Sequence, residues 1–249
     1  MNEFVRAVHW IFTSSNWSQF NFGTGIRGQL AYHVELSAIS LAIAAAVAIP
    51  VGLLVGHKRR GQFLAVSVAN IGRAIPSFGL LVLAFIVVTN LWPRLGFTML
   101  PTVIALVLLA IPPILTNTYV GIQSVDADTV EAARGMGLSE PQVLLRLEMP
   151  LAAPLIMAGL RTSAVTVVAT ATLAGFAGGG GLGVSLNLGF TGHDTEYILI
   201  GAAMLVAALA VLTEVTFGAL ERVVTPRTRS RQKAKAPGPV PESQAVSRA

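Results

Sequence analysis

The chain has 249 residues, 53% of them hydrophobic and only 12% charged, and it carries a formal net charge of +5. Because about 25% of residues in an average soluble domain are charged, this composition excludes an ordinary water-soluble globular protein and indicates an integral membrane protein. Cysteine is absent from the sequence, which excludes disulfides, iron–sulfur clusters and thiolate metal sites.

The first 31 residues are predicted to form an extracytoplasmic or interfacial segment. The sequence MNEFVRAVHWIFTSSNWSQF lacks the basic start and the continuous apolar stretch of a cleavable signal peptide. We therefore expect a retained amphipathic segment at the membrane surface before the first span.

Hydropathy predicts about five membrane-spanning helices, so the expected fold class is an all-α polytopic membrane protein with a transmembrane domain over residues 32–222. A bilayer crossing needs about 20 apolar residues, and the sequence offers such runs at 32–56, 70–92, 98–120, 151–176 and 197–220.

The second apolar run is interrupted by Arg73 and Pro76. We interpret residues 62–75 as a cytoplasmic or interfacial approach and residues 76–92 as the main crossing, because proline breaks a helix or starts a new one. Whether the chain has five spans or six stays open.

Residues 126–150, here called the charged loop, lie between two long runs that contain no Lys, Arg, Asp or Glu, at 95–125 and 162–193. Asp128 stands three residues before Glu131, which is the spacing of a capping box and predicts a helix over 127–134. The loop is the part of the chain that most resembles a soluble protein.

A glycine turn at 135–137 is predicted to end this first helix of the charged loop. Ser139 and Gln142 repeat the capping-box spacing and predict a second helix over 140–148, closed by Pro150. Two capped helices in so short a loop suit a shallow groove on another protein; the alternative is an amphipathic hairpin on the membrane surface without a partner.

Two ionisable residues fall within the predicted fourth and fifth spans. Arg161 and Glu214 are expected at similar depth, about 12 to 15 Å from the cytoplasmic side at 1.5 Å per residue. They form a possible intramembrane pair, since ionisable groups in a bilayer usually have partners. The alternative is that both helices begin deeper in the cytoplasm and both side chains reach its surface.

The basic residues indicate the orientation of the chain. One cluster occupies residues 57–60, after the first span, and another follows the last span: Arg222, Arg227, Arg229, Arg231, Lys233 and Lys235. Because cytoplasmic loops are enriched in Lys and Arg, we expect the N-terminus outside, the charged loop inside and no nucleic-acid partner. Residues 223–249 are predicted to be a disordered, basic cytoplasmic tail.

The charged loop resembles the EAA loop found in the membrane subunits of binding-protein-dependent ABC importers. The resemblance rests on Glu131-Ala132-Ala133, on Gly135 and Gly137, and on the end of the loop over 147–150, which departs slightly by reading Glu148-Met149-Pro150. Residues 73–77 are similar to a helix start that these subunits carry in the corresponding span.

A second resemblance concerns the solute. The segment ATATLAGFAGGGGLG at 169–183 looks like that of permeases for osmoprotectants such as glycine betaine, choline and carnitine. Methionine importer permeases have the same five-span plan and a related glycine-rich stretch, so they remain an alternative.

The resemblance implies the permease fold of a type I ABC importer in a bacterial cell membrane, with a coupling loop at 122–150. The residues that would contact a separate cytoplasmic ATPase are Glu131, Ala132, Ala133, Arg134, Gly135, Met136 and Gly137. It also implies a second permease subunit, identical or related, and an extracytoplasmic solute-binding protein. ATP would be used by the partner, and no cofactor would be bound by this chain.

An enzyme is not expected from this sequence. No lysine stands in a P-loop pattern, and the glycine run 178–183 is interpreted as an external turn. The four histidines have no metal-ligand spacing. The remaining rivals are a transporter driven by an ion gradient and a membrane scaffold that recruits a cytoplasmic protein.

Overall fold

The computed structural model describes residues 2–18, 25–59, 63, 67 and 75–224, and these residues form helices with no strand among them. The predicted all-α fold class is therefore confirmed. The predicted basic tail lies outside the described residues from 225 onward, as does most of the predicted approach at 62–75, including Arg73.

Among the described residues, four helical segments are long and apolar enough to cross a membrane: α3 (Ile26–Lys58), α6 (Leu100–Gln123), the continuous stretch Glu140–Ala177 and α11 (Glu196–Val224). The fifth predicted crossing is α5 (Ser77–Leu91), which has 15 residues and begins after Pro76, as expected for a proline that starts a helix. At 1.5 Å per residue α5 spans about 22 Å, which is less than a full hydrocarbon core. Four spans and one shorter apolar helix are consistent with the predicted plan of about five.

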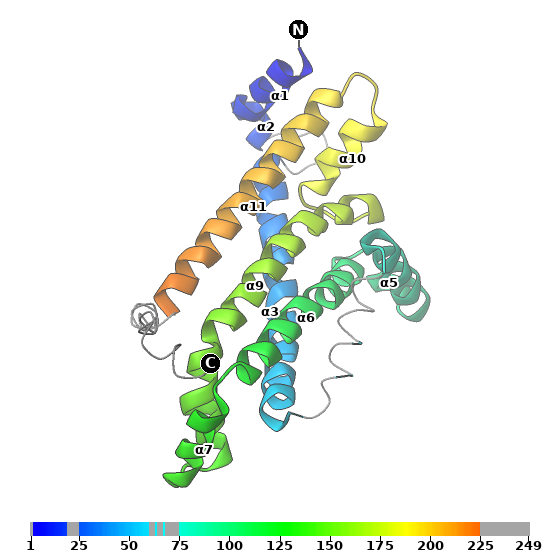
Figure 1. Cartoon of the computed structure of the whole chain (residues 1–249). Coiled ribbons are helices and arrows are strands. Elements are labelled where there is room, and N and C mark those ends of the chain that lie inside the picture. The colour runs from blue at the N-terminus through cyan, green and yellow to red at the C-terminus, as the bar shows by residue number, and fades with distance from the viewer. Residues whose placement is uncertain (1, 19–24, 60–62, 64–66, 68–74, 225–249) are drawn as a thin grey trace, which may run out of the picture.

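The long helices pack side by side around α6, which contacts α3, α5 and α9 (Met149–Thr170), while α11 lies against α9 (Figure 1). Their shared core is apolar and includes Leu36, Leu106, Ile114 and Val167. The outward face of α3 carries exposed Ile39, Ile43, Val47 and Val51 at a spacing of four residues. Such an apolar exterior suits contact with lipid or another membrane helix.

The second helix of the charged loop does not stop at Pro150, and that prediction was wrong. The chain runs from α8 (Glu140–Val143) through a π-helical turn, η2 (Leu144–Glu148), directly into α9. Proline lacks an N–H and its ring crowds the carbonyl four residues earlier. The wider π turn just before Pro150 accommodates this defect, so the charged loop and the fourth span share one continuous helical segment.

The two ends of the molecule differ in character (Figure 1). At one end lies α7 (Ala127–Gly135); at the other lie α1 (Glu3–Phe12), α2 (Ser14–Ser18) and α10 (Gly183–Thr191). The predicted external turn falls in this second group. It follows the 3-10 turn η3 (Ala171–Ala177), and a side chain at Gly183 would overlap the backbone oxygen of Thr172. A second short 3-10 turn, η1 (Pro93–Leu95), follows α5.

The N-terminal helix α1 is docked against the start of α11. Trp10 is buried beside Gly201, and Arg6 contacts Asp194 at 3.0 Å and lies 4.4 Å from the centre of the Tyr197 ring. This hydrogen bond and ion pair lower the pKa of Asp194 and raise the pKa of Arg6. The segment predicted to precede the first span is therefore held to the bundle.

Candidate functional site

The first helix of the charged loop, α7, begins at a different cap from the predicted one. Asp126 stands just before α7 with non-helical backbone angles, and its Oδ1 accepts a hydrogen bond of 2.9 Å from the Thr129 backbone N–H. The proposed capping box of Asp128 and Glu131 was wrong because Asp128 already lies inside the first turn. The bond from Thr129 stabilises the charged carboxylate and lowers the pKa of Asp126.

The glycine turn and the second cap follow the sequence more closely. Gly137 adopts a left-handed backbone with φ +87°, whereas Gly135 is the last residue of α7 and does not. Ser139 precedes α8, and the Gln142 Oε1 accepts a hydrogen bond of 2.9 Å from the Ser139 N–H. A left-handed residue followed by a capped helix reverses the chain within a few residues.

The charged loop has its own small apolar core. Val125, Val130, Ala133 and Val143 are buried together, and Leu138 and Leu147 pack against them. Ala133 of the predicted contact residues thus faces inward and supports the loop. The others are exposed: Glu131, Ala132, Arg134, Gly135, Met136 and Gly137.

The exposed residues form the far tip of the molecule. Met136 is 76% exposed, and a side chain added at Gly135 would meet no atom within 4 Å. Small side chains and backbone flanked by a protruding methionine offer a surface that a concave partner can approach closely. The tip is therefore an exposed surface that the small apolar core of the loop supports from beneath.

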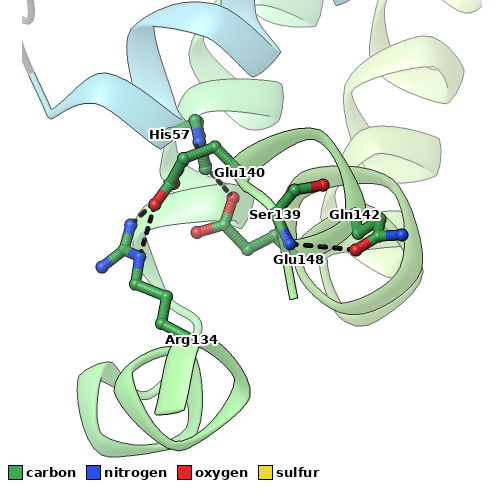
Figure 2. A network of polar contacts seen from close by, with 6 residues as sticks. All are labelled: His57, Arg134, Ser139, Glu140, Gln142 and Glu148. Atoms are coloured by element: carbon green, nitrogen blue, oxygen red, sulfur yellow. Dashed lines mark hydrogen bonds and ion pairs between the residues drawn. The ribbon is translucent and has the colours of Figure 1, made fainter. Parts of the chain in front are cut away.

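A chain of charges connects the charged loop to the end of α3 (Figure 2). Arg134 donates two hydrogen bonds to the Glu140 carboxylate, at 2.8 and 3.0 Å, which lower the pKa of Glu140 and raise that of Arg134. The His57 Nε2 lies 3.0 Å from the Glu140 Oε2, and its Nδ1 lies 2.6 Å from the Glu148 Oε2.

Sequence reasoning missed this network. In the sequence, His57 is one of four residues in the basic cluster at 57–60, and Glu148 is a departure from the EAA pattern. The available signal was an acidic residue at the membrane end of the loop together with a histidine at the end of the preceding span. Nothing in the sequence pairs two residues that are 91 positions apart.

The structure also brings Arg161 and Glu214 together, in an ion pair between α9 and α11. Arg161 has a second partner, Glu221, at 3.3 Å, which the sequence reasoning did not include. Glu214 and Glu221 are seven residues apart, two helical turns, and so face the same side of α11. One arginine on α9 therefore meets two carboxylates on α11.

Comparison with known proteins identifies the family. The family model described as the binding-protein-dependent transport system inner membrane component matches residues 48–230. The chain belongs to this family. It is accordingly a multi-pass membrane component of a transport system, and the family resemblance of the charged loop is confirmed.

Relatives of this inner membrane component include two permeases named for their solutes. The choline transport system permease protein of Bacillus subtilis is 37% identical over 210 residues, covering 83% of this chain and 93% of that protein. The carnitine transport permease protein of Listeria monocytogenes is 40% identical over 194 residues, covering 78% of this chain and 84% of that protein.

Among solved structures, the inward-facing MetNI methionine ABC transporter has the same fold. It is 22% identical with a TM-score of 0.71, over 81% of this chain and 96% of that chain. The predicted fold of an ABC importer permease is therefore confirmed for this inner membrane component.

Proposed function

We propose that this chain is the permease subunit of an ATP-driven importer for an osmoprotectant such as glycine betaine, choline or carnitine, and that it catalyses no reaction itself. The observation that carries the proposal is the 37–40% identity to choline and carnitine permeases over more than three quarters of the chain. The likeness to the methionine transporter, at 22% identity, concerns the fold alone.

The exposed tip of the charged loop is the proposed contact with a separate cytoplasmic ATPase. Glu131, Ala132 and Met136 lie on or beside a capped helix supported by its own core, so the surface keeps its shape when a partner pushes on it. ATP is used by that partner, and this chain binds no cofactor. A second permease subunit and an extracytoplasmic binding protein complete the proposed complex.

The lining of a cavity in this subunit supports the idea that the binding protein selects the solute and the permease lets it pass. A cavity of about 410 Å³ lies between α3, α9 and α11, and its lining is apolar apart from Ser37 and Thr213. A quaternary ammonium ion is attracted to aromatic faces, but among the described residues that line this cavity Phe217 is the only aromatic one. We place high-affinity selection in the binding protein and passage in the permease pair.

Transport then follows from rigid movement of the helices. When two ATPase subunits close on ATP, the charged loops of two permease subunits are drawn together, and the attached helices tip from inward-facing to outward-facing. This is alternating access biased by a ligand that favours one state.

The test is uptake by the reconstituted complex of permease, ATPase and binding protein. Glu131→Lys and Gly135→Asp each place a new charge on the tip, so both should abolish uptake of labelled osmoprotectant and substrate-stimulated ATP hydrolysis while the protein still inserts. The matched control is Glu196→Lys, the same change on an exposed residue at the opposite end, which should leave both activities intact.

Normal uptake in both tip variants would overturn the proposed contact. The same preparation, supplied with methionine instead, separates the two solute classes; methionine uptake without osmoprotectant uptake would move the chain to the alternative class. Uptake that persists without ATP and stops when ion gradients are collapsed would instead indicate a secondary transporter.

A further inference from the structure

His57 lies where three helices meet at the loop end of the molecule. It is the next-to-last residue of α3, and its side chain is only 11% exposed. Its two ring nitrogens face different carboxylates, Glu140 at the start of α8 and Glu148 at the end of η2 (Figure 2). The Glu148 side chain is 7% exposed, so it lies almost out of contact with water.

The number of hydrogen bonds that His57 can donate depends on its protonation state. A neutral imidazole has one N–H donor and one acceptor, so it can donate to only one of the two carboxylates, whereas the imidazolium donates to both. Hydrogen bonds between charged groups are the strong ones, and a buried carboxylate without a partner is costly. Of the two carboxylates that face His57, Glu140 also accepts hydrogen bonds from Arg134.

The network closes a triangle whose other two sides are already rigid. The charged loop continues directly into α9, and it follows α6 through Val125, which belongs to the loop's own core. On the second side, α3 lies tightly against α6: a side chain at Gly52 would come within 2.7 Å of the Thr118 Cβ, and one at Gly56 within 2.7 Å of the Ile122 Cβ. The His57 contacts then tie the end of α3 to the loop itself.

We propose that His57 is a positioning residue that fixes the charged loop to α3, so that a displacement of the loop moves α3, α6 and α9 as one body. The proposal rests on the proposed function, because it assumes that the ATPase pushes on the loop. In this proposal His57 transmits the displacement of the loop to α3. The contact between His57 and Glu148 must therefore persist throughout the transport cycle.

The first test is the number of solute molecules imported per ATP hydrolysed by the reconstituted complex. His57→Ala leaves the exposed tip unchanged, so ATP hydrolysis should continue while the import ratio falls by about tenfold, the size of a typical coupling between sites. The matched control is His193→Ala, which removes an exposed histidine at the opposite end and should leave the ratio unchanged.

The second test replaces the contact between His57 and Glu148 by a covalent one. Since the chain contains no cysteine, the double variant His57→Cys/Glu148→Cys carries only the two introduced thiols. Before treatment it should be uncoupled like His57→Ala. A short bifunctional methanethiosulfonate crosslinker should restore the import ratio, and a reducing agent should abolish it again.

Three results would overturn the proposal: an unchanged import ratio in His57→Ala, loss of ATP hydrolysis together with uptake and no recovery on crosslinking, or a crosslinked protein that binds its partners but cannot transport. The last would show that the contact must break during the cycle. Including Glu131→Lys in the same series separates the two ideas, because normal activity in that variant contradicts the proposed function itself, whatever His57→Ala does.

Discussion

At the scale of single residues, Arg161 differs from its partners because one guanidinium serves two carboxylates. From its position on α9 it contacts both Glu214 and Glu221, which lie on α11 and share this guanidinium. Removing the arginine therefore leaves two carboxylates without it, while removing one carboxylate leaves the arginine with the other. The arrangement predicts unequal effects for changes that a simple pair would make equal.

We expect Arg161→Ala to lower the midpoint of thermal unfolding in detergent by a few degrees, and Glu214→Ala to lower it by less. Adding Glu214→Ala to Arg161→Ala should cost little further, because the arginine that Glu214 contacts is already gone. Differential scanning fluorimetry of the purified permease measures this. Additive losses in the double variant Arg161→Ala/Glu214→Ala would show that the two side chains do not act as a pair.

The residue pairs also show what a sequence can reveal. Arg161 and Glu214 could be matched because each is an isolated charge in an apolar span, at a depth that counting residues along a helix can estimate. Glu221 and His57 could not, since both stand near the ends of spans, where charge is common and carries no information about partners. Pairing at those positions is decided by packing in three dimensions.

At the scale of elements, the charged loop could be recognised from its composition, but its detailed construction could not. The sequence predicted a helix, a glycine turn and a second capped helix, and all three are present. It placed the first cap at Asp128 because two aspartates two residues apart, Asp126 and Asp128, both suit a helix start. The predicted end of the second helix at Pro150 was wrong because a π turn can accommodate a proline, and no simple sequence pattern marks such a turn.

The cap of α7 gives a prediction with a definite sign. The pKa of Asp126 is lowered in the folded protein by the Thr129 N–H, so its contribution to helix stability is present above the ordinary carboxyl pKa and is lost as the pH falls through the lowered folded value. We expect hydrogen–deuterium exchange in α7, corrected for the intrinsic rate, to increase below about pH 4.

Variants separate this cap from the one that the sequence suggested. Asp126→Asn keeps a good cap without the charge, so α7 should stay protected and lose most of the change with pH. Asp126→Ala should exchange faster at every pH, whereas Asp128→Ala should behave like the unmodified protein. Faster exchange in Asp128→Ala but not in Asp126→Ala would restore the predicted capping box.

At the scale of the whole molecule, the long helices, the apolar exterior and the two dissimilar ends are all consistent with a protein that crosses a membrane. The charged loop is covalently continuous with α6 and α9 and tied by His57 to α3, while α11 joins the bundle through α9 and Arg161. Under the proposed function, a force applied at the loop would reach α3, α6 and α9 directly, and α11 through its packing and ion pair with α9. Such a plan needs the loop on the side of the membrane where ATP is available.

The orientation is the last prediction, and the absence of cysteine makes it simple to test. Met136→Cys places one thiol on the loop tip, and Phe12→Cys places one on α1 at the opposite end, where the native side chain is 82% exposed. Because the basic residues after the spans favour the cytoplasm, a membrane-impermeant maleimide should label Phe12→Cys in intact cells and Met136→Cys only in inverted vesicles. Co-expressed ATPase should slow the second reaction by covering the tip. Labelling of Met136→Cys from outside would place the charged loop where no cytoplasmic ATPase could reach it, and the coupling scheme would fail with it.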